Sequence, residues 1–315
     1  MAGWTAEDIP DQSGRTALVT GANSGLGFHT ALQLGRHGAR VLMATRDVSR
    51  GEQAMQRARA AAPDASFELV PLDLADLSSI SSAAADVASR VERLDILVNN
   101  AGVMAIPHQH SADGFEKQLG TNHLGHFALT GRVLPLLLAA PAPRVVTVSS
   151  NAHRGAKRIN FDDLQSERSY SAIGAYSQSK LANLLFAAEL DRRAGAAGTS
   201  LVSAAAHPGL AATSLMQARP GQPTSRLKSL GAKVVFKLFG QSEAAGAWPQ
   251  LYAATMPDVV GNEYFGPSGM GEQRGYPQRV GRSTWAGDEP SAARLWEVSK
   301  ELTGVRYEEL SAPAA

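Results

Sequence analysis

Short apolar segments alternate with helical segments along most of this sequence, and this alternation limits the fold more than any other feature. TALVT at 16–20 and ARVLMAT at 39–45 are apolar, and the segment FHTALQLGRHG between them repeats its apolar residues at helical spacing. Continuous apolar strands joined by helices are typical of a parallel sheet that is covered on both faces. Because crossovers between parallel strands are right-handed, the sequence predicts an α/β fold with a doubly wound parallel sheet flanked by helices.

The same pattern continues as far as residue 269, which predicts one domain of the Rossmann type over residues 1–315. Further strands are expected at 66–72, 94–100, 144–150, 200–206 and 261–269, and helices at about 52–62, 79–91, 113–139, from Ala175 onward, and at 242–255. We expect residues 16–150 to form the half that binds a cofactor. Residues 151–290 then form the catalytic and substrate half.

The turn GANSGLG at 21–27 joins the first expected strand to the first expected helix. Glycines at this place let a phosphate approach the helix N-terminus, where free N–H groups and the helix dipole favour an anion. The spacing is G-x-x-x-G-x-G, which differs from the general G-x-G-x-x-G fingerprint. A tight turn without a ligand is the alternative, but the position in the first βα unit favours dinucleotide binding.

The residues after the second expected strand indicate which dinucleotide is bound. We expect that strand to end at Ala44, so that Thr45 stands where a carboxylate would bind the ribose hydroxyls of NAD. The guanidinium of Arg46 suits a 2′-phosphate. Asp47 has nearly the sequence spacing of the NAD carboxylate, but we expect it to cap the next helix. The sequence therefore favours NADP(H), with NAD(H) as the alternative.

Tyr176 and Lys180 stand four positions apart in the segment AYSQSKLANLLF. On a helix this spacing places both side chains on one face, about one turn apart. A free tyrosine, with a pKa of about 10, is a poor acid–base catalyst near neutral pH. A nearby ammonium and an oxidised nicotinamide both stabilise a phenolate and lower that pKa. The pair is predicted to be catalytic if Tyr176 faces a cofactor, and to be two ordinary surface residues otherwise.

Six motifs, in order, make the chain resemble the short-chain dehydrogenase/reductase family from about Thr16 to Gly266. They are TGANSGLG at 20–27, NNAG at 99–102, Asn122 in TNHLGHF, Ser150 in VTVSS, YSQSK at 176–180 and HPG at 207–209. Within the family, NHLGHFALT, SSNAHR, INFDDLQ and YSQSKLANLLF resemble the retinol dehydrogenase and protochlorophyllide reductase branch.

This resemblance implies an enzyme that transfers a hydride between NADP(H) and a hydrophobic carbonyl or alcohol substrate. By resemblance, Tyr176 is the general acid in reduction and the base in oxidation, and Lys180 also holds the nicotinamide ribose. Ser150 would donate a hydrogen bond to the substrate oxygen, whereas strand alternation turns Ser149 the other way. Asn122 is expected to distort its helix and to hold a water that links Lys180 to solvent.

The resemblance also implies a set of cofactor contacts. Asp73 is expected at the adenine, unless it caps a helix instead, and Thr213 at the nicotinamide carboxamide. The predicted set is Gly21, Asn23, Ser24, Gly25, Leu26, Gly27, Arg46, Asp73, Leu74, Asn99, Ala101, Gly102, Tyr176, Lys180, Pro208, Gly209 and Thr213.

Composition argues against several other classes of protein. The formal net charge is only +1, which does not favour a nucleic-acid partner, and the absence of cysteine rules out disulfides and thiolate metal sites. His123, His126, His153 and His207 lack an HExxH spacing, so we expect packed or hydrogen-bonded histidines and no metal. The N-terminal segment does not resemble a signal peptide or a membrane anchor, and no apolar run reaches the ~18 residues of a membrane span, which predicts a cytoplasmic protein without membrane contact.

The predicted partner is a small carbonyl or alcohol substrate. The sequence leaves the oligomeric state open, with a homodimer and a homotetramer as the candidate assemblies. A non-catalytic protein that senses NADP(H) on the same fold is the alternative function, because the fold alone does not separate the two. Residues 210–241 follow HPG and contain Pro, Gly and an apolar cluster at 234–239. We expect them to form a mobile lid over an apolar substrate, with a fixed surface helix as the alternative.

Overall fold

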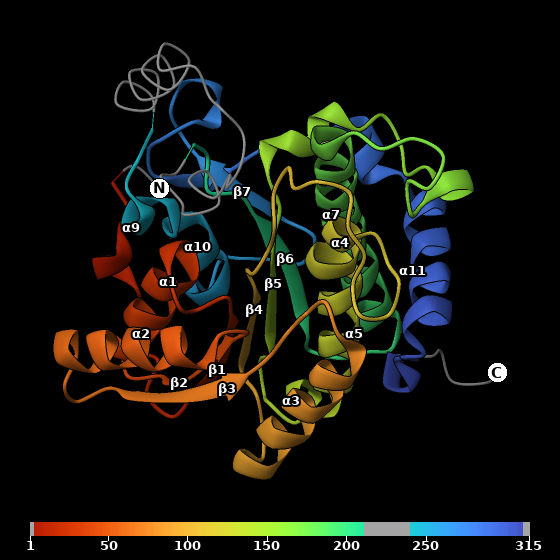
Figure 1. Cartoon of the computed structure of the whole chain (residues 1–315). Helices are drawn as coiled ribbons and strands as arrows, with labels where there is room; N and C mark the ends of the chain where they lie inside the picture. The colour runs from red at the N-terminus through yellow and green to blue at the C-terminus, as the bar shows by residue number, and fades with distance from the viewer. Residues whose placement is uncertain (1–2, 211–239, 311–315) are drawn as a thin grey trace.

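One eight-stranded sheet organises the chain, and seven of its strands are parallel (Figure 1). The computed structural model describes residues 3–210 and 240–310. Along the sheet the strand order is β3-β2-β1-β4-β5-β6-β7-β8, and β8 runs antiparallel to β7. The strands are β1 Thr16–Thr20, β2 Arg40–Thr45, β3 Ser66–Pro71, β4 Ile96–Asn99, β5 Arg144–Val148, β6 Val202–Ala206, β7 Tyr264–Pro267 and β8 Pro277–Arg279. The predicted single doubly wound α/β domain is confirmed.

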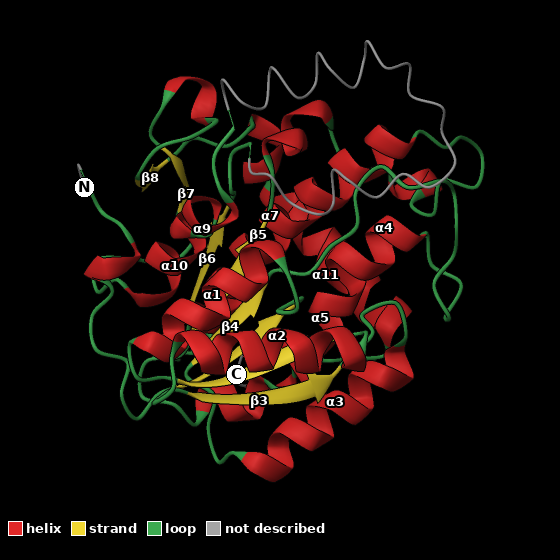
Figure 2. Ribbon diagram, turned by 60° about the vertical axis from the view of Figure 1, so that its left-hand side comes forward, coloured by secondary structure: helices red, strands yellow, loops and turns green. Residues whose placement is uncertain are grey.

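Helices cover both faces of the sheet, as Figure 2 shows. On one face lie α1 Gly25–Arg36, α2 Val48–Ala61, α9 Glu243–Gly246 and α10 Trp248–Thr255. On the other lie α3 Leu77–Arg90, α4 Lys117–Leu119, α5 Gly125–Arg132, α6 Leu134–Leu138 and α7 Ala172–Ala196, with α11 Glu289–Thr303 packed beside α7.

Strand alternation explains why the strands read as continuous apolar runs. In β1, Ala17 and Val19 pack against one layer of helices, whereas Leu18 packs against the other. All three are buried, and burial of a leucine side chain such as that of Leu18 stabilises the fold by roughly 1.5–3 kcal/mol. A polar residue at any of these positions would face a closed apolar layer.

Several elements differ from the sequence expectation, among them the antiparallel strand β8, which was not expected. The single helix expected over 113–139 is divided into α4, a π-helix at Gly120–Leu124, α5 and α6, and Pro135 stands in the first turn of α6. The strand β2 extends to Thr45, one residue beyond Ala44. The helix α11 was not predicted, because it follows the last family motif, although its buried residues Ala292, Leu295 and Trp296 repeat at helical spacing.

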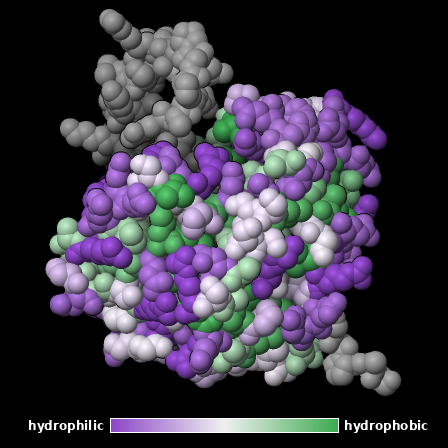
Figure 3. Space-filling view, turned by 60° about the horizontal axis from the view of Figure 1, so that its bottom comes forward, coloured by the Kyte–Doolittle hydropathy of each residue, from purple (hydrophilic) through white to green (hydrophobic). Residues whose placement is uncertain are grey.

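The face in Figure 3 mixes small apolar patches with more abundant polar side chains. Among the helices of residues 3–210 and 240–310, none is both long and apolar enough to cross a membrane.

Candidate active site

A cleft of about 360 Å³ opens at the carboxyl ends of β1 and β4, where the strand order reverses. Ligands bind at this kind of reversal in open α/β sheets. Eleven residues predicted for the cofactor line the cleft: Gly21, Asn23, Ser24, Gly25, Leu26, Gly27, Arg46, Asp73, Leu74, Ala101 and Gly102. Residues that sequence reasoning did not assign to a cofactor site also line it, among them Asp47, Arg50, Asn100, Val103 and Thr121.

The glycine turn requires glycine at two positions, Gly27 because of space and Gly21 because of its backbone conformation. A Cβ atom on Gly27 would lie 2.4 Å from the carbonyl oxygen of Gly21 and 2.5 Å from Nδ2 of Asn100. Gly21 itself has a φ of +68°, a conformation that other residues rarely adopt. Ser24 precedes α1 but makes no side-chain cap hydrogen bond, so the first N–H groups of the helix can bind an anion.

Thr20 connects the glycine turn to the helical segment that carries Asn122. Its Oγ1 accepts hydrogen bonds from the backbone N–H groups of Asn100 (2.9 Å) and Ala101 (3.0 Å), and lies 2.9 Å from Nε2 of His126. Nδ1 of His126 lies 2.9 Å from the carbonyl oxygen of Asn122 and must donate to it. Because burial lowers the pKa of His126 to about 4, the ring is neutral and Nε2 accepts from the threonine hydroxyl.

Two arginines reach the cleft beyond the end of β2. Arg46 is exposed, and both Arg46 and Arg50 line the cavity. The carboxylate of Asp47 accepts the N–H of Arg50 at 3.0 Å and caps α2, as the sequence predicted. Sequence reasoning missed Arg50, although its position four residues after Arg46 was a usable signal.

Tyr176 and Lys180 lie in the second and third turns of α7, on one face as their spacing predicted. Nζ of Lys180 is 5.8 Å from the centre of the Tyr176 ring and donates a hydrogen bond to the carbonyl oxygen of Val148 at 3.0 Å. Asn183 donates to the same carbonyl at 3.0 Å. The lysine is 4% exposed, and burial lowers its pKa to about 8.

Ser150 lies beside Tyr176 just after β5 ends. Its Oγ accepts the N–H of Ala152 at 3.1 Å and so caps a short 3₁₀ helix, Asn151–Gly155, which leaves its own proton free to donate. Ser149 points the opposite way and donates to the carbonyl of Lys180 at 2.8 Å. Burial raises the pKa of Tyr176, and the hydrogen bond with Ser150 partly offsets the rise. The phenol is therefore protonated at neutral pH.

Asn122 lies inside the π-helix, so the helix is distorted where the sequence analysis placed a distortion. Its side chain exchanges two hydrogen bonds with the backbone of Val103, at 2.8 and 3.0 Å, and donates to Oγ of Ser179 at 2.9 Å. A Cβ atom on Gly102 would lie 3.0 Å from Oδ1 of Asn122 and 3.6 Å from Nζ of Lys180. Gly102 is thus the point where the cofactor cleft meets the catalytic candidates.

The side chain of Asn99 is turned away from the cleft. Asn99 is buried and donates to Oγ1 of Thr130 at 3.0 Å, because strand alternation turns it into the core and leaves its neighbour Asn100 at the cleft. This corrects the expectation for the Asn99 side chain. Thr213 lies outside the described residues, as does 211–239 of the expected lid.

Asp73 lines the cleft without capping a helix. Its carboxylate accepts the N–H of Ala75 at 2.9 Å, whereas Asp76 caps α3. The helix-cap alternative for Asp73 is therefore wrong.

Pro208 and Gly209 follow β6 and lie outside the 360 Å³ cavity. Gly209 has a φ of +63°, and a Cβ there would lie 2.4 Å from the carbonyl oxygen of Gln273. The side chain of Gln241 donates to the carbonyl of Pro208 at 2.8 Å, and its backbone N–H donates to the carbonyl of Leu210 at 3.0 Å. The backbone of residues 208–210, which follow β6, is therefore held by hydrogen bonds to Gln241 and Gln273.

The other histidines of the sequence analysis are also hydrogen-bonded. Nδ1 of His153 donates to the carbonyl of Ser150 at 2.7 Å, and Nε2 of His123 lies 2.9 Å from Oγ of Ser299. His207 accepts the N–H of Gly209 through Nδ1 at 3.2 Å. Together with His126, all four hold the backbone or neighbouring side chains in place.

Sequence comparison decides the family. The family described as short chain dehydrogenase matches residues 15–223. The chain belongs to the short chain dehydrogenase family. This confirms the resemblance drawn from the six motifs, and short chain dehydrogenases are oxidoreductases.

Curated relatives place this short chain dehydrogenase close to the retinol dehydrogenase branch. Retinol dehydrogenase 14 of Mus musculus is 40% identical, over 93% of this chain and 86% of that protein. Retinol dehydrogenase 13 of Homo sapiens is also 40% identical, over 93% and 85%.

Solved structures share the fold of this chain. A crystal structure of an uncharacterised protein from Mycobacterium paratuberculosis is 44% identical, covers 97% of this chain and 99% of that one, and has a TM-score of 0.79. The Pseudomonas aeruginosa RhlG/NADP active-site complex is 26% identical, covers 81% and 94%, and has a TM-score of 0.62.

Replacing Gly27 by alanine tests the geometry of this turn. Gly27→Ala places a methyl group against the carbonyl of Gly21, so the turn must open and the dissociation constant for NADPH should rise by roughly tenfold or more. Gly195→Ala is the matched control, since Gly195 lies in α7 with open space around it. Fluorescence titration with NADPH measures both. Equal affinity of Gly27→Ala and the wild type would contradict this geometry.

Proposed function

We propose that this protein is an NADP(H)-dependent alcohol dehydrogenase or carbonyl reductase that acts on hydrophobic substrates. One observation carries the proposal. Ser150, Tyr176 and the buried ammonium of Lys180 lie together at the carboxyl end of β5, and Gly102 joins them to the dinucleotide cleft. A proton donor, a hydrogen-bond donor and a positive charge beside a nicotinamide site are the groups that carbonyl reduction needs.

In the reducing direction, bound NADPH supplies the hydride to the carbonyl carbon. The hydroxyl of Ser150 donates a hydrogen bond to the substrate oxygen and holds it against Tyr176. The phenol of Tyr176 transfers its proton to that oxygen, which completes the alcohol. Because burial raises the pKa of Tyr176, the phenol is in the protonated form that this direction needs.

In the oxidising direction, Tyr176 must act as a phenolate. The ammonium of Lys180, 5.8 Å from the phenol ring, lowers the free energy of that anion. Lys180 would also bind the nicotinamide ribose, and Asn122 would hold a water that returns protons from solvent. The side chain of Asn122 bonds Val103 and Ser179, and its backbone carbonyl accepts Nδ1–H of His126, so the water would share one of these acceptors.

The preference for NADP(H) rests on the charges at the end of β2. Arg46 and Arg50 both line the cleft, and guanidinium groups bind phosphate well. The carboxylate of Asp47, the group that could have favoured NAD(H), is engaged in capping α2. The NADP complex of the Pseudomonas aeruginosa relative supports the same cofactor.

The hydrophobic class of substrate is supported by the relatives and by the surface. Several relatives are named retinol dehydrogenase, and one from Mus musculus, 39% identical, is named polyprenol dehydrogenase. Ile173, one helical turn before Tyr176 in α7, is 58% exposed. Large apolar side chains exposed beside a catalytic group suit an apolar ligand.

Replacing Tyr176 by phenylalanine tests the catalytic assignment. Tyr176→Phe removes the transferable proton and should lower kcat by ~10²-fold or more, with little change in the dissociation constant for NADPH. The loss of NADPH absorbance with a panel of apolar ketones and aldehydes measures turnover.

Tyr252→Phe is the control, because it removes a phenol hydroxyl that bonds Asp258 and does not line the cleft. Wild-type turnover in Tyr176→Phe would refute the assigned role. A wild-type protein that binds NADPH but reduces none of the panel would favour the cofactor-sensing alternative.

Replacing Arg46 by aspartate tests the cofactor preference. Arg46→Asp exchanges a phosphate ligand for a carboxylate that repels phosphate, so the ratio of kcat/KM for NADPH over NADH should fall by roughly tenfold or more. Arg306→Asp makes the same charge change at an exposed position away from the cleft and should leave the ratio unchanged. If both variants keep the wild-type ratio, Arg46 is only a solvated charge.

A further inference from the structure

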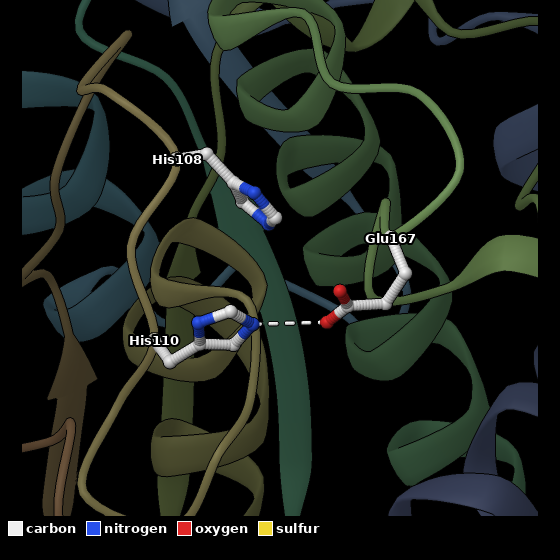
Figure 4. A group of neighbouring side chains, drawn as sticks. All are labelled: His108, His110 and Glu167. Carbon is white, nitrogen blue, oxygen red and sulfur yellow. Dashed lines mark hydrogen bonds and ion pairs between the residues drawn. The ribbon is translucent and has the colours of Figure 1, made fainter.

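Two histidines and a glutamate gather outside the active site. His108 and His110 lie on the loop between β4 and α4, and Glu167 lies on the loop that leads to α7. One ligand atom from each lies within 4.8 Å of those of the other two, and all three side chains are exposed. Figure 4 shows them converging on one space, with Nε2 of His110 2.9 Å from Oε1 of Glu167.

The two loops are held together by hydrogen bonds that do not involve these three side chains. The backbone N–H of Glu116, which pairs with His110 in a β-bridge, donates to Oε1 of Gln165 at 2.7 Å. The hydroxyl of Tyr170 donates to the carbonyl of Ile106 at 2.7 Å. The two loops that carry the three side chains are therefore held in position by the fold before any ligand binds.

Gln118 adds a second connection between the loops. Its side chain accepts the N–H of Ala105 at 2.7 Å and donates to the hydroxyl of Tyr170 and to the carbonyl of Ala172, each at 2.9 Å. The ring of His108 stacks on Tyr170 with 4.6 Å between ring centres, which limits the directions in which its nitrogens point. Supporting contacts of this kind orient metal ligands in proteins.

The chemistry of the three side chains matches one class of ligand. Two imidazoles and a carboxylate are the donor set that Zn²⁺ accepts, with water completing a tetrahedron. Zinc–ligand bonds of about 2.0–2.1 Å place tetrahedral ligand atoms roughly 3.3 Å apart. The separations, up to 4.8 Å, must therefore shorten, which exposed side chains achieve by rotation about their own bonds.

We propose that His108, His110 and Glu167 form a binding site for a zinc-like divalent cation that joins the loop after β4 to the loop before α7. The site is separate from the chemistry of Tyr176, and its histidines differ from the four that the sequence analysis considered. Bound metal would cross-link the chain that leaves Gly102 to the chain that enters α7.

Metal binding to the untagged full-length protein tests this site. Isothermal titration with ZnCl₂, checked by metal analysis after dialysis, should show one Zn²⁺ per chain. His110→Gln and Glu167→Gln should each weaken binding by roughly tenfold or more, and the double variant His108→Gln/His110→Gln should abolish it.

His37→Gln is the control, since His37 is an accessible histidine that bonds within α1 and should not affect binding. Circular dichroism establishes that each variant is folded. Absence of zinc binding in the wild type, or equal binding in the double variant, would overturn the proposal. Cofactor binding and turnover are separate readouts, so this result does not depend on the proposed function.

Discussion

The candidate site depends on an ammonium that is held inside the protein. Lys180 is nearly inaccessible and bonds the carbonyl of Val148, and burial lowers its pKa from the ordinary value of 10.5 to about 8. Between these two values the unfolded chain binds more protons than the folded one, so the free energy of unfolding rises with pH over this window. Below about pH 8, burial of the charged ammonium lowers the free energy of unfolding by its full amount, on the order of 3 kcal/mol. This loss of stability accompanies the placement of a positive charge beside Tyr176.

The second constraint is the tight junction between the cofactor turn and the catalytic helices. The hydroxyl oxygen of Thr20 accepts hydrogen bonds from the N–H groups of Asn100 and Ala101, which follow β4. The ring of His126 links this hydroxyl to the carbonyl of Asn122. Gly27 and Gly102 are glycines because backbone and side-chain atoms already fill the space beside them. Hydrogen bonds and closely packed atoms therefore connect the cofactor turn directly to the π-helix that carries Asn122.

Most of this arrangement could be predicted from the sequence, because it rests on local patterns. Strand alternation separated Ser150 from Ser149, helical spacing paired Tyr176 with Lys180, and the cap at Asp47 followed from its place before a helix. The errors arose where tertiary packing decides. Asn99 was assigned to the cleft, yet the pleat of β4 turns it towards Thr130. The histidine and glutamate cluster joins loops that are 57 residues apart, and no spacing rule brings such residues together. The raised pKa of Tyr176 depends on burial, whereas the sequence analysis considered only the charges of the lysine and of an oxidised nicotinamide.

The central claim is that the positive charge of Lys180 lowers the pKa of the Tyr176 phenol when the cofactor is bound. The most direct test is a pH titration of tyrosinate absorbance with NADP⁺ bound, taken as the difference between wild type and Tyr176→Phe and repeated in the Lys180→Met background. The account predicts that Tyr176 ionises at least about one pH unit lower with the lysine present than with methionine in its place. The same apparent pKa in both backgrounds would contradict it.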